Sequence, residues 1–168
     1  MLAAVLSDTH DHIGNTRRAL ALAGERGAAL IIHCGDLVAP FMLRELAAFK
    51  GPVHIVWGNN EGDLALLIQV AGGLPNLSLH GQWGEVEVEG VRLAFTHTPE
   101  LAHLLAASRR YQAVFCGHTH AAATERLEGC LLLNPGDVMG KDARPSFALY
   151  DTATAQAEHI SFEQAPGP

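Results

Sequence analysis

Short apolar runs alternate with helical patterns over the first part of the chain. The runs are apolar throughout and end at turn-forming residues, which is typical of strands buried on both faces. We expect strands at residues 2–7, 28–33 and 52–57 and helices at residues 13–26, 41–49 and 64–71. In the first helix, Asn15 is the expected cap and Gly27 the expected stop signal. Alternation of strand and helix predicts parallel pairing with right-handed crossovers.

The rest of the chain carries alternating patterns around Glu-Gly pairs, which are typical of antiparallel hairpins. The expected elements are hairpins over residues 85–95, 123–134 and 146–162, a helix over residues 98–109 and a strand over residues 113–116. This mixture predicts an α/β fold with two sheets and helices on the outside. We expect one domain, residues 1–162, followed by a flexible tail at residues 163–168.

Charge and cysteine usage narrow the class of protein. The 168 residues carry a formal net charge of −7, which argues against general nucleic-acid binding because that relies on clustered Lys and Arg. The three cysteines, Cys34, Cys116 and Cys130, lie far apart in apolar runs and form neither a disulfide framework nor a zinc knuckle. The expected location is therefore the reducing cytoplasm. No run approaches the roughly 20 apolar residues of a membrane span, so we expect no membrane association.

Ligand-type side chains follow five separate apolar runs, at the point where each run ends. They are Asp8, His10, Asp36, Asn59, His97, His118 and His120. Taken singly, each residue is typical of a turn, a helix cap or a packed histidine. Taken together, they predict one crevice, because ligands bind at the carboxyl ends of the strands in α/β sheets. Oxygen and imidazole donors without a thiolate suit two divalent metals that share a carboxylate.

The order of these motifs resembles that of the calcineurin-like metallophosphoesterases. The chain reads "SDTH" at 7–10, "HCGD" at 33–36, "GNNEGD" at 58–63, "FTH" at 95–97, "GHTH" at 117–120 and "NPGD" at 134–137. Over residues 2–151 it looks most like the small YfcE-type phosphodiesterases, which are relatives of the retromer subunit Vps29. The resemblance implies an αββα sandwich of two mixed β-sheets flanked by helices, the metallo-dependent phosphatase fold.

The resemblance also implies which residues hold each metal. One metal would take Asp8, His10, Asp36 and His120, and the other Asp36, Asn59, His97 and His118, with Asp36 as the bridge. Asp36, Asn59 and His97 are the implied catalytic residues, and a hydroxide bridging the metals would attack phosphorus in line. Mn²⁺ is the expected ion, with Ni²⁺, Fe²⁺, Zn²⁺ or Mg²⁺ as alternatives. Thr119 is expected to point elsewhere, because neighbours alternate along an extended segment.

Asn60 departs from the wider superfamily, in which a histidine follows the Gly-Asn pair and helps to protonate the leaving group. An amide cannot act as that acid, and a positioned acid typically contributes about 10²–10⁴-fold in rate. We therefore expect a phosphodiesterase that prefers small or nucleotide-type diesters with good leaving groups. Loops at residues 11–15, 60–64 and 136–145 are expected to set specificity.

Two other functions stay open at this point. One is a Vps29-like protein-binding scaffold with weak or no activity, and the other is a phosphomonoesterase or nucleotide-polyphosphate hydrolase. A homo-oligomer formed through the apolar hairpins is a further expectation. His33 is expected either to pack in the core or to contact a metal ligand, and His12 to face substrate or solvent.

Overall fold

Strand β1 (Leu2–Leu6) buries both of its faces, and this alternation defines the layers of the molecule. In the computed structural model, which describes residues 1–165, Ala4 and Leu6 pack into a core beneath three helices. Ala3 and Val5 point the opposite way, into a second core between two sheets. Successive side chains of a strand lie on opposite faces, so a run that is apolar throughout requires a covering layer on each side.

The strands form two mixed sheets, with orders β11-β10-β1-β2-β3-β4 in sheet A and β5-β6-β7-β9-β8 in sheet B. Sheet A contains β1, β2 (Leu30–His33), β3 (Val53–Ile55), β4 (Leu77–Leu79), β10 (Ser146–Asp151) and β11 (Gln156–Ser161). Sheet B contains β5 (Trp83–Val88), β6 (Val91–Thr96), β7 (Ala113–Phe115), β8 (Ala123–Leu127) and β9 (Cys130–Asn134). Strands β1 to β4 run parallel, as do β6, β7 and β9, so each sheet collects several carboxyl ends at one edge. The remaining pairs are antiparallel.

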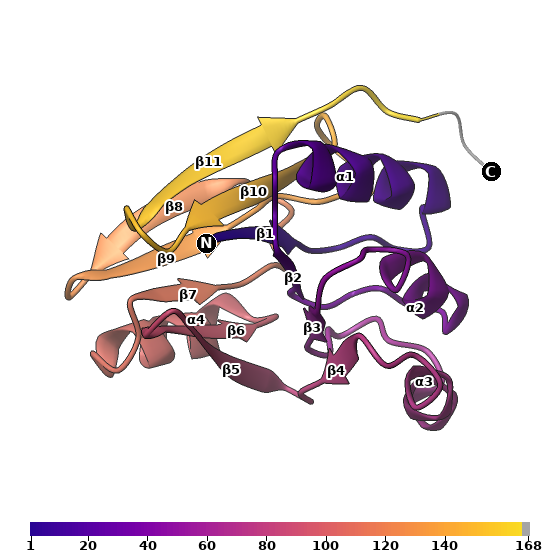
Figure 1. Cartoon of the computed structure of the whole chain (residues 1–168), viewed down its shortest axis with the longest axis horizontal. Helices are drawn as coiled ribbons and strands as arrows, with labels where there is room; N and C mark the ends of the chain where they lie inside the picture. The colour runs from indigo at the N-terminus through magenta and orange to yellow at the C-terminus, as the bar shows by residue number, and fades with distance from the viewer. Residues whose placement is uncertain (166–168) are drawn as a thin grey trace.

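Helices cover the outer face of each sheet (Figure 1). Against sheet A lie α1 (Ile13–Glu25), α2 (Phe41–Leu46) and α3 (Leu64–Ala71), and against sheet B lies α4 (Pro99–Ala107). Figure 1 shows α1, α2 and α3 together on one side of the molecule and α4 on the other. The predicted αββα sandwich of two mixed sheets is confirmed.

The two Glu-Gly pairs form the hairpin turns that the sequence predicts. Glu89 and Gly90 join β5 to β6 with φ of 53° and 79°, and Glu128 and Gly129 join β8 to β9 with φ of 52° and 87°. Positive φ at both central residues is the geometry whose twist matches that of the flanking strands. Thr98 is the N-cap of α4 and Pro99 its first residue, also as predicted.

The start of α1 differs from the prediction. His12, not Asn15, is the N-cap, and its Nδ1 accepts a hydrogen bond from the Asn15 backbone N–H. The Asn15 amide is buried and donates instead to the backbone carbonyls of Val138 and Met139, at 3.0 Å each. The expected cap is therefore wrong, because tertiary partners take the Asn15 side chain. Gly27, with φ of 82°, does follow the end of the helix.

The chain continues past β11 along the body of the molecule. Glu163 pairs with Arg144 at 2.9 Å, and the backbone N–H of Ala165 donates to Asn15 Oδ1 at 2.8 Å. The last part of the predicted tail, residues 166–168, lies outside the described residues. Among the helices of residues 1–165, none has the length and apolar character needed to cross a membrane.

Candidate metal centre

All seven predicted ligand residues lie just beyond the carboxyl ends of parallel strands. Asp8 and His10 follow β1, Asp36 follows β2, Asn59 follows β3, His97 follows β6, and His118 and His120 follow β7. Three of these strands belong to sheet A and two to sheet B, so both sheets contribute to the same place. The side chains divide into two clusters that share Asp36.

The first cluster contains Asp8, His10, Asp36 and His120. His10 Nε2 lies 3.7 Å from Asp8 Oδ1 and 3.5 Å from Asp36 Oδ2. His120 Nε2 lies 3.5 Å from the same Asp8 oxygen, and the two imidazole rings stack with centroids 5.3 Å apart. Asp8 and Asp36 are buried, whereas the two histidines are partly exposed. Asp8, His10 and His120 thus offer donor atoms close enough together to hold one ion.

The second cluster contains Asp36, Asn59, His97 and His118. Asn59 Oδ1 lies 2.9 Å from His97 Nε2 and 2.8 Å from His118 Nδ1, and the two imidazole nitrogens are 3.3 Å apart. Asp36 Oδ2 lies 3.5 Å from His97 Nε2. His97 is buried, while His118 and Asn59 are exposed, so this cluster opens to solvent.

These donor atoms fit a cation better than they fit one another. His97 Nδ1 lies 2.8 Å from the Cys34 carbonyl, which can only accept, so Nδ1 carries the ring proton and Nε2 presents a lone pair. That lone pair faces two oxygen acceptors. In the first cluster, Asp8 Oδ1 and His10 Nε2 are buried and have no hydrogen-bond partner in the described residues. Converging lone pairs and orphaned buried atoms are costly without a positive charge between them.

The backbone at these ligands is in an unusual conformation. Asp8, His10, Asp36, His118 and His120 all have positive φ, between 40° and 72°. Such residues cost roughly 1–3 kcal/mol each and cluster at functional sites. The "GHTH" motif at residues 117–120 is consequently a tight turn. The prediction that this segment is extended is therefore wrong. The Thr119 hydroxyl nevertheless points away from the ligands, to Asn134 Nδ2 at 3.0 Å.

Two residues of the "GNNEGD" motif hold Asp36 in place. Asn60 donates to Asp36 Oδ1 from its backbone N–H at 2.8 Å and to Oδ2 from its side chain at 2.7 Å. The Glu61 carboxylate accepts hydrogen bonds from the backbone N–H groups of Asp36, Val38 and Gly58, at 2.8–2.9 Å. A Cβ atom at Gly58 would lie 2.0 Å from Asp36 Oδ1, so glycine is required there. The role of Asn60 in this structure is thus to position the Asp36 carboxylate, and not to protonate a leaving group.

Comparison with known proteins agrees with this geometry. A sequence model of the calcineurin-like phosphoesterase superfamily domain matches residues 1–155. The chain belongs to this superfamily. A phosphodiesterase of Methanocaldococcus jannaschii is 28% identical over 166 residues, which is 97% of this chain and 100% of the relative.

Solved structures share the fold of this phosphoesterase. A structure described as a novel archaeal phosphodiesterase superposes with a TM-score of 0.89 at 26% identity, over 96% of this chain and 100% of that one. The phosphoesterase YfcE of E. coli superposes with a TM-score of 0.68 at 20% identity, over 96% and 99%. The second likeness supports the fold alone.

Burial and neighbouring side chains shift several pKa values at and near the candidate site. Burial by itself would raise the pKa of Asp8, but the nearby His10 and Ser7 side chains outweigh burial and hold it below its ordinary value. The interaction with Asp8 raises the pKa of His10. Burial raises the pKa of Cys34 well above its ordinary value and that of Cys116 to about 12, so both thiols are protonated in the metal-free protein.

Two contacts beside this site were not predicted from the sequence. Asp137 is 2% exposed, and its Oδ2 lies 2.9 Å from His120 Nδ1. It follows the end of β9, which runs parallel to β7. The rule that collects polar residues at the ends of parallel strands would therefore have found it. Glu61 was missed as well, because its partners are backbone N–H groups that leave no sequence signal.

Two cavities flank the turn that carries His118 and His120. One, of about 490 Å³, is lined by Thr119, His120, Ala121, Ala122, Asp142, Ala143, Arg144, Ser146, His159 and Ser161. The other, of about 380 Å³, includes Thr119, His103 and Glu125. The first cavity is lined by one predicted ligand, His120, and so borders the candidate metal centre.

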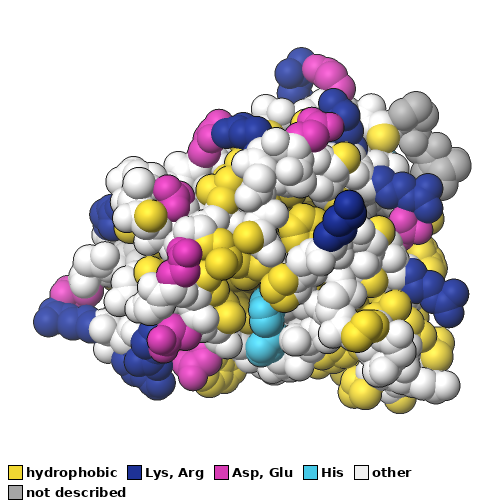
Figure 2. Space-filling model, in the orientation of Figure 1, with side chains coloured by type: hydrophobic (Ala, Val, Ile, Leu, Met, Phe, Trp, Pro, Cys, Tyr) yellow, Lys and Arg dark blue, Asp and Glu magenta, His cyan; other side chains and the backbone are white. Residues whose placement is uncertain are grey.

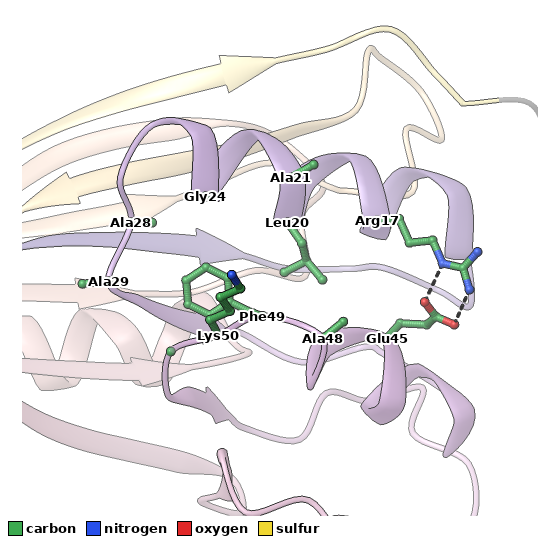
Figure 3. Close-up of a pocket in the computed structure, with 11 residues that line it drawn as sticks. Arg17, Leu20, Ala21, Gly24, Ala28, Ala29, Glu45, Ala48, Phe49 and Lys50 are labelled. Atoms are coloured by element: carbon green, nitrogen blue, oxygen red, sulfur yellow. Dashed lines mark hydrogen bonds and ion pairs between the residues drawn. The ribbon is translucent and has the colours of Figure 1, made fainter.

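A larger groove of about 870 Å³ lies between α1 and α2 and contains none of the predicted ligands (Figure 3). Figure 2 shows a hollow with hydrophobic side chains near the middle of this face. Leu20 and Phe49 point into the groove, and Arg17 and Glu45 close one end with two hydrogen bonds of 2.9 Å and 2.7 Å. The residues that line this groove in the described part of the chain include no cluster of metal ligands.

Proposed function

We propose that the chain is a dinuclear metal-dependent phosphodiesterase whose metals are held by the seven residues of the two clusters. The observation that carries this proposal is the convergence of lone pairs around Asp36, in a chain of the phosphoesterase superfamily. A phosphodiesterase relative that aligns along its whole length supports a diester as the substrate. Complete ligand sets favour an enzyme over a Vps29-like scaffold.

The residues would divide the work between two neighbouring ions. Asp8, His10 and His120 would hold the first ion, Asn59, His97 and His118 the second, and Asp36 both. Two such metals, when bound, supply activation of the attacking water and stabilisation of charge on the phosphate oxygens. Asn60 and Glu61 keep the bridging carboxylate in one orientation. Because the side chains of Asn59 and His118 are exposed, an ion held by them would be accessible to substrate.

The surroundings of the site favour diesters with good leaving groups. Asn60 offers no acidic proton, and its amide is already hydrogen-bonded to Asp36. The best substrate is therefore a diester whose leaving group needs little protonation. A diester carries two organic groups, and the cavity that includes His120 offers space for one of them.

Several finer features are part of the proposal. Mn²⁺ is the proposed ion, with Ni²⁺, Fe²⁺, Zn²⁺ or Mg²⁺ as alternatives, because carboxylate, amide and imidazole donors without a thiolate suit divalent ions of this group. The cytoplasm is the proposed location, which the three free, buried cysteines support. The net charge of −7 supports a small substrate in preference to a nucleic-acid backbone. Self-association stays a prediction.

Hydrolysis of a chromogenic phosphodiester and of its monoester tests the proposal. Metal-stripped protein is assayed with Mn²⁺, Ni²⁺, Zn²⁺ or Mg²⁺ added back. We expect metal-restored diester cleavage that falls more than about 100-fold in Asp36→Asn, since even the outer partners of metal ligands typically contribute 10–100-fold. Asp151→Asn is the matched control. It makes the same chemical change on β10, opposite Leu2 and therefore at the end of β1 away from the ligands.

Other outcomes identify the alternatives. Faster monoester cleavage would assign the chain to the phosphomonoesterases. If the protein is folded but shows no turnover with any metal, the proposal of an enzyme is overturned and the Vps29-like scaffold is favoured.

A further inference from the structure

Asp137 is a buried carboxylate that none of the proposed ligand roles uses. It is 2% exposed and belongs to the segment that follows β9. Its Oδ2 lies 2.9 Å from His120 Nδ1, on the opposite side of the imidazole from the first cluster. An isolated buried carboxylate is costly, so this contact calls for a reason beyond packing.

The contact fixes which nitrogen of His120 carries the proton. An ionised carboxylate can only accept hydrogen bonds, so Nδ1 is the donor and Nε2 is left with its lone pair. That lone pair faces the first cluster, where Asp8 Oδ1 lies 3.5 Å from His120 Nε2. The other tautomer would put a proton where a metal ion has to bind.

Asp137 is itself held rigidly against the loop that carries Asp8. The backbone N–H of Lys141 donates to Asp137 Oδ2 at 2.9 Å. The next two residues, Val138 and Met139, donate their backbone N–H groups to the carbonyls of Ser7 and Asp8, at 3.0 Å each. These hydrogen bonds fix the position of the Asp137 carboxylate relative to Asp8. The contact with Asp137 therefore also orients His120 relative to Asp8.

In the part of the chain that the structure describes, the second cluster has no such carboxylate behind a histidine. His97 Nδ1 donates to the Cys34 backbone carbonyl at 2.8 Å, which fixes the same tautomer with a neutral acceptor. An anionic acceptor makes a stronger hydrogen bond to imidazole than a neutral one does. The two clusters are thus unequal in charge as well as in exposure.

We propose that Asp137 is a positioning residue for the metal centre: it holds His120 in the Nδ1-protonated tautomer and strengthens its bond to the first metal. The inference rests on the proposed metal centre. It implies that a change at Asp137 weakens one of the two metal-binding steps and leaves the other largely unaltered.

Mn²⁺ titration of metal-stripped full-length protein by calorimetry tests this. In Asp137→Asn, one dissociation constant should rise by about 10–100-fold, the usual effect of losing an outer partner of a metal-bound histidine. Asp151→Asn is the matched control, because it makes the same chemical change on β10 opposite Leu2, away from both clusters. It should leave both constants within about twofold of wild type, since it contacts no ligand.

A second measurement on the wild type does not depend on how the variant folds. Nitrogen-15 NMR of the metal-free protein reports the tautomer of each histidine, and His120→Gln identifies the His120 signals. We expect His120 protonated at Nδ1. Protonation at Nε2, or unchanged Mn²⁺ constants in a folded Asp137→Asn, would overturn the role of Asp137. Wild-type protein that binds no Mn²⁺, Zn²⁺ or Ni²⁺ would overturn the metal centre itself, and the inference with it.

Discussion

His33 is fully buried, and each of its ring nitrogens has one partner. The Gly35 backbone N–H donates to Nδ1 at 3.2 Å, so Nε2 carries the ring proton and donates to Thr9 Oγ1 at 3.2 Å. A second ring proton would remove the acceptor that Gly35 uses. Burial lowers the pKa of His33 to about 4. Of the two roles expected from sequence, packing in the core is the one these contacts support.

The depressed pKa predicts a pH dependence of stability. Between pH 6.5 and about 4, the unfolded chain binds a proton at His33 and the folded chain does not, so unfolding becomes easier as pH falls through this window. We expect His33→Gln to flatten this part of the curve by up to about 3 kcal/mol. Urea unfolding of metal-free protein at several pH values measures the difference. The exposed His103→Gln is the control, and parallel wild-type and His33→Gln curves would contradict the prediction.

Glu61 should stabilise the loop that carries Asp36. Its carboxylate accepts from the backbone N–H groups of Asp36, Val38 and Gly58, and a glutamine there would turn an amide donor toward at least one of them. We expect Glu61→Gln to lower the free energy of unfolding by about 1–3 kcal/mol, the cost of leaving such groups unpaired. Urea denaturation measures it. The exposed Glu25→Gln should change stability little, and equal effects of both changes would refute the role of Glu61.

The sequence predicts where ligand-type residues gather but not all of their contacts. Parallel strands place their carboxyl ends together, so Asp8, Asp36 and His97 can be expected at one edge from their positions after apolar runs. That they bind metal stays a prediction. The Asn15 cap was wrong, because an amide that caps a helix in isolation is taken by carbonyls more than 120 residues away. Contacts of that kind have no local pattern.

At the scale of elements, turn chemistry and hydrophobic period predict most of the topology. The Glu-Gly hairpins and the Pro99 helix start follow from local conformational preference. Strand ends are less predictable, because pairing partners decide them. Strand β3 pairs over Val53–Ile55 alone, although the apolar run spans residues 52–57. Strand β4, of three residues, has too short a pattern to be recognised.

Two glycines in open surroundings should respond oppositely to alanine. A Cβ atom at Gly24 or at Gly129 would meet nothing within 4 Å, but Gly24 lies in α1 and Gly129 has φ of 87°. Gly24→Ala should therefore stabilise the protein by about 0.5–1 kcal/mol. Gly129→Ala should destabilise it by about 1 kcal/mol or more, because an L-residue resists positive φ. Thermal unfolding of the two variants checks this, and a shift in the same direction would contradict it.

At the scale of the whole molecule, the candidate metal centre joins the two sheets. Asp8 and Asp36 come from sheet A, and His97, His118 and His120 from sheet B. Any ion that binds these residues would bind the folded chain far better than the unfolded one.

Metal binding should therefore raise the melting temperature. At a metal concentration of 100 times the dissociation constant, one site contributes about 2.7 kcal/mol, or roughly 5–10 °C for a chain of this size. Calorimetry with chelator and with Mn²⁺ measures the shift, which should be smaller in His120→Ala and smallest in Asp36→Asn. Equal shifts in all three proteins would place the metal elsewhere.

The order of strands also bears on how the protein is synthesised. Sheet B is one continuous stretch, from Trp83 to Asn134, inserted between the first four strands of sheet A and the last two. Strand β1 lies beside β10, which leaves the ribosome only after all of sheet B. Throughout that interval the apolar β1 has one unpaired edge, which is a template for pairing with other chains. A nascent chain stalled after Asn134 would already hold the seven candidate ligands and still be prone to aggregate.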